Sequence, residues 1–174
     1  MRLLQLLRAA VFLEVGIIIT FTYDKTIAVG LNGLISFGVG YALVSVLYAL
    51  TKGKKLNEFD HLGLTAVALA IGLAAANLPS EYQHQWFRHL VALLGLCTAI
   101  YEGLRVRKVG VKTVAGKERL ISASLGLALA LLFVILPMSD RNAVGFFDTY
   151  MLLNAVHLAI GAFTETGSKE QKSA

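Results

Sequence analysis

Six long apolar blocks dominate this chain of 174 residues and constrain its fold more than any other feature. They cover residues 6–22, 27–50, 62–78, 89–101, 120–138 and 143–163. The only acidic residues inside them are Glu14 and Asp148. A helix needs about 20 residues, within a range of about 17–25, to cross the bilayer core. The fourth block reaches this length when it is extended to Trp86 and Leu104. The pattern therefore predicts an all-α integral membrane protein with six transmembrane helices.

The composition supports this prediction and excludes several other classes of protein. Hydrophobic residues make up 56% of the chain and charged residues 16%, against about 25% charged in a typical soluble domain. The single cysteine excludes a disulfide scaffold and a site with several cysteine ligands. A b-type haem needs facing histidines at one depth, and only His157 lies deep in a block. We therefore expect no metal and no cofactor, and because no catalytic motif is present we expect no enzyme.

The basic residues define an orientation in the membrane. If six blocks span it, thirteen of the 16 Lys and Arg residues lie on one side and three on the other. The positive-inside rule places the basic side in the cytoplasm, with both termini. The formal charge of +5 then reflects basic residues beside the inner leaflet. The sequence contains no soluble domain that would bind nucleic acid. We expect a multi-pass protein of the inner (cytoplasmic) membrane whose partner is the lipid bilayer.

Internal similarity predicts that the six helices form three repeated helical hairpins within a single membrane domain, residues 1–174. The first and third outer turns both read acid, base, polar, then Ala-Val-Gly, starting at Asp24 and Asp140, with one residue inserted in the first turn. The only two prolines, Pro79 and Pro137, end the outgoing helices of the second and third hairpins. The expected hairpins cover about 1–51, 61–104 and 119–164, with polar basic linkers at 52–60 and 105–118 and a short polar tail at 165–174.

Small residues recur at a spacing of four along the apolar blocks. This spacing lets helix backbones approach closely in a membrane, where association depends on packing rather than on the hydrophobic effect. We expect these stripes to be seams between helices of the bundle, and they also offer faces for a homo-oligomer. The stripes are Ser36 and Gly40; Ala68, Gly72 and Ala76; Gly95, Ala99 and Gly103; and Ser122, Gly126 and Ala130.

Two segments resemble the HdeD-like membrane proteins. Residues 5–19 read QLLRAAVFLEVGIII and resemble the first helix of that family, with a basic start and a glycine before the outer turn. Residues 29–40 read VGLNGLISFGVG and resemble its Gly-rich returning helix. Proline in the outer turn also fits Pro79 and Pro137, although the first turn has Tyr23 instead. The resemblance implies an inner-membrane protein of acid resistance and stress response, with no assigned biochemical activity.

Four polar residues inside the blocks are candidates for a site that binds protons or a small ligand. A carboxyl inside the membrane is expected to face the bundle interior or a wet cavity. Glu14 and His157 lie at similar depth, since the first and last helices run in opposite directions, and Asn154 lies one turn from His157. We expect them to form one buried polar cluster, with Asn32 contributing to a pocket. The imidazole would then respond to pH in the range of acid stress.

A second group of residues forms a candidate pH-sensitive rim on the outer side. The alternative is a solvated turn with ordinary ion pairs, each worth little, and we favour it. The rim residues are Asp24, Glu81, His84, Arg88, His89 and Asp140.

Three function classes remain. The first, which we favour, is a non-enzymatic stress protein of the HdeD-like type. The second is a transport component, such as the substrate-binding membrane subunit of a transporter, with a polar pocket for a small ligand. The third is an intramembrane enzyme, which would need Glu14 and His157 to converge because no other reactive pair is available.

Overall fold

The computed structural model describes residues 2–52 and 62–170, and this part of the chain is helical with no strand. The helices are α1 (Arg2–Phe21), α2 (Ile27–Lys52), α3 (Leu62–Ala76), α4 (Gln83–Val109), α5 (Val114–Ile135) and α6 (Asp140–Glu170), with the short 3₁₀ helix η2 (Ser80–Tyr82) before α4. The prediction of an all-α protein is confirmed.

Five of these helices are long and apolar enough to cross a membrane, namely α1, α2, α4, α5 and α6. The expected third span is the exception, since α3 has 15 residues. At 1.5 Å per residue it covers about 22 Å, less than the hydrocarbon core of about 30 Å. The described helices thus give five candidate spans and one shorter apolar helix where the sequence pattern predicts six spans.

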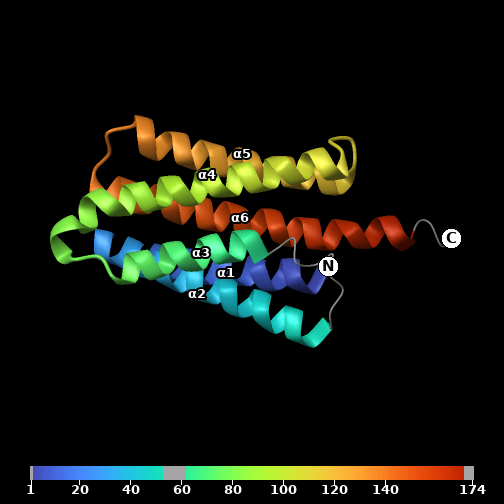
Figure 1. Cartoon of the computed structure of the whole chain (residues 1–174), viewed down its shortest axis with the longest axis horizontal. Helices are drawn as coiled ribbons and strands as arrows, with labels where there is room; N and C mark the ends of the chain where they lie inside the picture. Colours follow the sequence, from blue (N-terminus) through green and yellow to red (C-terminus); the bar gives the residue numbers. More distant parts are fainter. Residues whose placement is uncertain (1, 53–61, 171–174) are drawn as a thin grey trace.

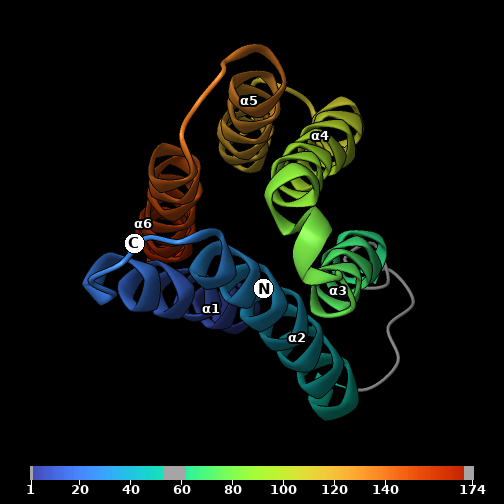
Figure 2. The same cartoon turned by 90° about the vertical axis from the view of Figure 1, so that its left-hand side faces the viewer.

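The six helices form a ring in the order of the chain, which closes where α6 meets α1 (Figure 2). They lie roughly parallel to one long axis (Figure 1). The start of α1, the end of α6 and the turn between α4 and α5 lie at one end, which we call the basic end because Arg105, Arg107, Lys108 and Lys112 lie there. The turns at residues 22–26, 77–82 and 136–139 lie at the opposite end, the turn end.

Neighbouring helices in the ring pack unequally. The most extensive contacts join α4 to α5, α1 to α6 and α2 to α3, whereas helices joined by a turn at the turn end touch less. Glycine explains the closeness of α4 and α5, since a Cβ added to Gly95 would lie 2.6 Å from the carbonyl oxygen of Gly126. A Cβ added to Gly38 would likewise lie 2.5 Å from the carbonyl oxygen of Ala68 on α3.

The small-residue stripes therefore lie partly where the spacing predicts. Gly95, Gly126 and Ala130 lie in the α4–α5 seam, and Ala68 and Gly72 in the α2–α3 seam. The register differs on α2, where Gly38 makes the close approach and Ser36 is exposed. Gly103 and Ala76 at the ends of their stripes take no part, since Gly103 has no neighbouring atom within 4 Å of an added Cβ and Ala76 is exposed.

Aromatic side chains fill the centre of the ring. Phe12 of α1 contacts Phe37 and Tyr41 of α2 and Tyr150 of α6, with ring centroids 4.8–6.3 Å apart. Nearer the turn end, Phe87 of α4 packs against Phe133 of α5 and Phe147 of α6. Four of these five pairs are edge-to-face, which is a favoured geometry for aromatic rings. They join helices that lie far apart in the sequence into one core.

The boundary between α4 and α5 differs from the predicted linker at 105–118. Both helices extend into it, so only residues 110–113 separate them. Gly110 ends α4 with φ +91°, a conformation that favours glycine. Thr113 caps α5, since its Oγ1 accepts a hydrogen bond from Gly116 N at 3.0 Å. These local signals make a tight turn out of a basic stretch.

The other predicted boundaries agree with the structure to different extents. Pro79 and Pro137 follow the ends of α3 and α5, as the sequence predicts. The predicted tail at 165–174 is helical as far as Glu170. The linker at 52–60 falls almost wholly outside the described residues, as do residues 171–174.

Candidate functional site

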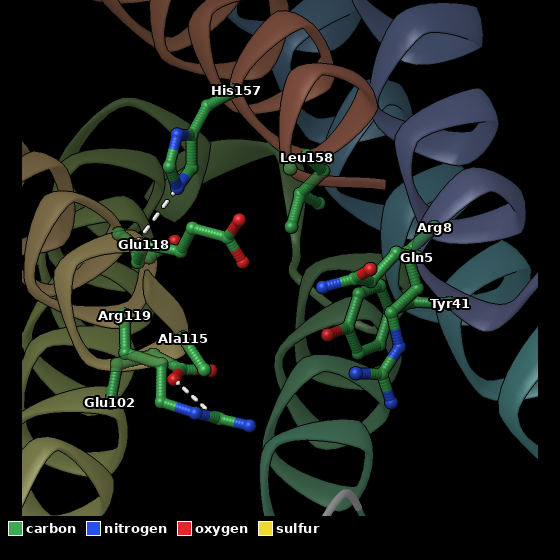
Figure 3. Close-up of a pocket in the computed structure, with 11 residues that line it drawn as sticks. Gln5, Arg8, Tyr41, Glu102, Ala115, Glu118, Arg119, His157 and Leu158 are labelled. Carbon is green, nitrogen blue, oxygen red and sulfur yellow. Dashed lines mark hydrogen bonds and ion pairs between the residues drawn. The ribbon is translucent and has the colours of Figure 1, made fainter. Parts of the chain in front are cut away.

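A polar cavity of about 100 Å³ lies at the basic end of the bundle, between α1 and α2 on one side and α4 and α5 on the other, with α6 beside it (Figure 3). Eight of the residues that line it carry polar or charged side chains. They are Gln5, Arg8, Tyr41, Glu102, Glu118, Arg119, Ser122 and His157. We call this site the basic-end cavity.

The wall formed by α1 and α2 carries a buried cation. Arg8 is 7% exposed although it lies in the second turn of α1. Its Nη2 donates to Ser45 Oγ at 3.4 Å, and that hydroxyl also accepts a hydrogen bond from Thr65 Oγ1 at 3.0 Å. The guanidinium carbon lies 4.8 Å from the centre of the Tyr41 ring, within the range of a cation–π contact. Arg8 thus contacts two side chains of α2, one of which is also bonded to α3.

The opposite wall holds charges of both signs. Arg119 Nη1 of α5 donates to Glu102 Oε2 of α4 at 2.8 Å, and both side chains are less than a fifth exposed. The carboxylate of Glu118 lies against α6, where a Cβ added to Gly161 would meet its oxygen at 3.1 Å. Figure 3 shows the carboxylate of Glu118 pointing toward the wall that carries Gln5 and Tyr41. The cavity thus has an anionic group facing a cationic wall.

Gln5 adds an unsatisfied acceptor to the cavity. Its Oε1 atom is buried and accepts no hydrogen bond from any residue that the structure describes. A buried carbonyl oxygen without a donor costs about 1–3 kcal/mol, so native proteins rarely leave one in place without a water or a ligand. Its position in a polar cavity identifies a place where a donor group would be stabilised.

The predicted cluster of Glu14, Asn154 and His157 is not assembled. Glu14 is exposed on the outer face of α1 and does not line the basic-end cavity. Asn154 is buried, but its Nδ2 donates to the carbonyl of Tyr150 in its own helix at 2.9 Å. Asn32 is exposed on α2. The prediction of one polar cluster was wrong because the sequence gives the depth of a residue but not the direction in which its helix face points.

His157 is the only member of that set in the cavity. Its Nε2 lies 2.9 Å from the backbone carbonyl oxygen of Glu118. A carbonyl oxygen only accepts hydrogen bonds, so Nε2 is the donor. The partner of His157 therefore lies on α5 rather than on α1. The reactive pair that an intramembrane enzyme would need, Glu14 with His157, is not brought together.

The residues of the predicted outer rim lie at the turn end. Some of them form structural contacts and the others are exposed. His84 Nδ1 approaches Asp140 at 2.9 Å, and this pair is well exposed. Arg88 Nη2 donates to the carbonyl of Leu136 at 2.7 Å, just beyond the last turn of α5. Asp24, Glu81 and His89 are exposed. None of these six residues lines the basic-end cavity.

Asp148 is the best-bonded acid near the turn end. It is 5% exposed and accepts hydrogen bonds from Thr20 Oγ1 of α1 at 3.0 and 3.2 Å. Lys25 Nζ donates to the same carboxylate at 3.2 Å, so Asp148 joins α6 to α1 and to the first turn. Among the residues that the structure describes, no three His, Cys, Asp or Glu side chains are grouped as metal ligands.

The sequence pattern did not predict most of the basic-end cavity, because its charged residues were interpreted as markers of membrane topology. Arg8 counted only as a positive-inside marker, although it shares one helix face with the buried residues Val11, Phe12 and Val15. That spacing was the available signal that Arg8 faces the interior. The spacing of three residues along one helix favours a pair between Glu102 and Arg105.

The structure instead pairs Glu102 with Arg119. The guanidinium of Arg105 lies 5.4 Å from the centre of the Tyr101 ring. A contact between helices separated by a turn has no signature in the spacing along one helix, so this pair was not predictable.

Comparisons with known proteins give no family for this chain. No family model, no curated protein and no solved structure matches it. Its function is therefore inferred from its own residues.

Proposed function

We propose that this chain is a non-enzymatic multi-pass protein of the inner (cytoplasmic) membrane that binds a small zwitterionic solute in the basic-end cavity. Five helices of spanning length support the membrane location. In this proposal the basic end faces the cytoplasm, since basic residues concentrate there. Both termini are then cytoplasmic, and the short apolar helix α3 completes a six-span bundle.

The proposal includes a bundle built from three hairpins, α1–α2, α3–α4 and α5–α6. Three observations support it. The helices follow the chain order around the ring, the extensive seams recur at every second interface, and α3 and α5 both end just before a proline. Three similar hairpins arranged around an axis would produce this alternation of loose and extensive contacts.

The juxtaposition of opposite charges across the cavity carries the proposal for the ligand. Arg8 and Tyr41 offer cationic and hydroxyl groups to an anionic part of a ligand, whereas Glu118 and Gln5 Oε1 accept from a donor part. The volume of about 100 Å³ is well below the roughly 300–1,000 Å³ of sites for drug-sized ligands. A small molecule with a carboxylate and an ammonium group matches both the size and the charges.

The biological setting in this proposal is stress tolerance. It rests on the resemblance of residues 5–19 and 29–40 to HdeD-like proteins. Solute binding at the cytoplasmic side would then take place in cells under acid stress, where His157 is the imidazole nearest the site.

A binding assay on the purified protein in nanodiscs tests the proposal. Glycine is the zwitterionic probe, with acetate and methylammonium as single-charge probes, and thermal unfolding is followed as each is added. We expect glycine to raise the melting temperature more than either single-charge probe, because only glycine engages both walls. A ligand that binds only the native state stabilises it by an amount that grows with the ratio of ligand concentration to dissociation constant.

Two variants and a control make this test specific. Glu118→Gln and Arg8→Gln should each abolish the preference for glycine, since each removes one of the two charges that face each other across the cavity. Lys117→Gln is the matched control, because Lys117 is exposed and does not line the cavity. Equal shifts with all three probes, or a glycine effect that survives both variants, would contradict the proposal.

A further inference from the structure

The exposed carboxyl of Glu14 has no partner within the bundle. Glu14 lies in the candidate span Leu3–Phe21 and faces outward. It forms no hydrogen bond or ion pair with the residues that the structure describes. Acidic side chains at membrane depth almost always pair with another group or face a wet cavity. A partner from outside this chain is therefore expected at Glu14.

The α1–α2 packing places Ser36 beside Glu14. A Cβ added to Gly40 would meet Val11, so these residues lie level in the antiparallel pair. Glu14 follows Val11 by three residues. Because α1 and α2 are antiparallel, Glu14 is level with position 37, three residues before Gly40. Ser36 is one residue from that level, about 1.5 Å along the axis. Ser36 also follows Gly33 by three residues, on the helix face that contacts α1.

Glu14 and Ser36 therefore lie at the edge of the α1–α2 seam, where both are exposed. Asn32 is exposed one helical turn away from Ser36. The surrounding face is apolar, since Leu13, Ile17 and Val39 are each more than 40% exposed. We call the polar group of Glu14, Ser36 and Asn32 the seam patch.

We propose that the seam patch is the contact between two copies of this chain in the membrane. A carboxyl accepts hydrogen bonds in either protonation state, whereas the Ser36 hydroxyl and the Asn32 amide donate. One patch thus carries both the acceptor and its donors, so it is complementary to itself. A twofold axis along the membrane normal keeps each residue at its own depth and lets Glu14 of one copy meet Ser36 of the other.

This contact differs from the homo-oligomer expected through the small-residue stripes. The close approaches of Gly38 and Gly95 are made to neighbouring helices of the same chain. Those seams are occupied inside the bundle. The seam patch is the exposed face on which polar groups at one depth remain to be satisfied.

Single-cysteine cross-linking in native membranes tests the contact. Replacing the one cysteine by Cys97→Ala leaves a background in which each new cysteine can bond only to another chain. Ser36→Cys should give a covalent dimer under mild oxidation. Leu131→Cys is the control, because Leu131 is exposed on α5 away from the patch, and it should remain monomeric.

Changing Glu14 then tests the polar contact itself. Glu14→Leu should raise the dissociation constant of the dimer by about three- to thirtyfold in detergent, the range of measured interhelical hydrogen bonds. The helix content should not change, because Glu14 forms no hydrogen bond or ion pair with the residues that the structure describes. Equal cross-linking at positions 36 and 131, a monomer in both, a Ser36→Cys adduct with a different protein, or an unaltered dissociation constant would overturn the proposal.

Discussion

The imidazole Nε2 of His157 on α6 donates a hydrogen bond of 2.9 Å to the backbone carbonyl of Glu118 on α5. Contacts between these two helices are fewer than those between α1 and α6 or between α4 and α5. This side-chain bond therefore joins α5 to α6 across a sparse interface beside the cavity.

Removing that donor should weaken the packing of α6 against α5. We expect His157→Ala to lower the free energy of unfolding by about 0.5–1.5 kcal/mol, the net contribution of a typical hydrogen bond. His157→Gln should lose less, because its amide still donates. Unfolding by denaturing detergent measures both. Val156→Ala is the control, since Val156 is exposed on the same helix, and a loss no greater than that of Val156→Ala would refute the role of the bond.

The carboxylate of Asp148 should contribute more than any other acid at the turn end. It is 5% exposed and accepts from Thr20 and Lys25. We expect Asp148→Ala to cost about 1.5–3 kcal/mol, the range for hydrogen bonds to a charged group. Asp24→Asn changes an exposed acid one residue from Lys25 and should stay within about 0.5 kcal/mol. Thermal unfolding of the two variants in one detergent gives the comparison, and equal losses would contradict it.

The sequence predicts the helices of this fold well and their packing less well. Uncharged apolar blocks locate α2 and α5 because transfer of charge into lipid is costly. Prolines correctly mark the ends of α3 and α5. The predicted linker between α4 and α5 was too long. Gly110 and Thr113 end and begin these helices through local backbone geometry, which cannot be inferred from a count of basic residues.

The candidate site was predicted less well than the fold. Depth along a helix follows from residue number, which is why Glu14 and His157 were grouped. The direction of a side chain depends on the neighbours of its helix, and these are set by the ring order. Arg8 and Glu14 lie only six residues apart on α1, yet Arg8 is buried and Glu14 is exposed. His157 was identified as a candidate, but its partner on α5 was not.

The glycines of the α4–α5 seam should tolerate no side chain. A Cβ at position 95 would lie 2.6 Å from the backbone oxygen of Gly126, which has no flexible end to move. We expect Gly95→Ala to destabilise the bundle by about 1–3 kcal/mol through overpacking. Gly103→Ala on the same helix meets no atom within 4 Å and should be neutral or up to about 1 kcal/mol more stable, because alanine favours the helix. Detergent unfolding curves of the two variants should separate them, and coincident curves would exclude the close approach.

Arg88 of α4 should stabilise the turn between α5 and α6 more than any other charged residue. Its guanidinium donates to the carbonyls of Leu136 at 2.7 Å and Phe133 at 3.5 Å. Both carbonyls lie at the C-terminal end of α5, where helical acceptors lack partners and a cation is favoured by the helix dipole. We expect Arg88→Gln to cost about 1.5–3 kcal/mol and to speed amide hydrogen exchange at residues 136, 138 and 139.

His84 provides the matched comparison, since its contact with Asp140 joins α4 to the start of α6, directly after the same turn. That pair is exposed, with 69% and 48% of the side chains accessible, and exposed ion pairs contribute about 0–1 kcal/mol. His84→Ala should therefore leave hydrogen exchange in the turn close to that of the parent chain. If His84→Ala loosened the turn as much as Arg88→Gln, the ion pair rather than the capped carbonyls would hold the end of α5 in place.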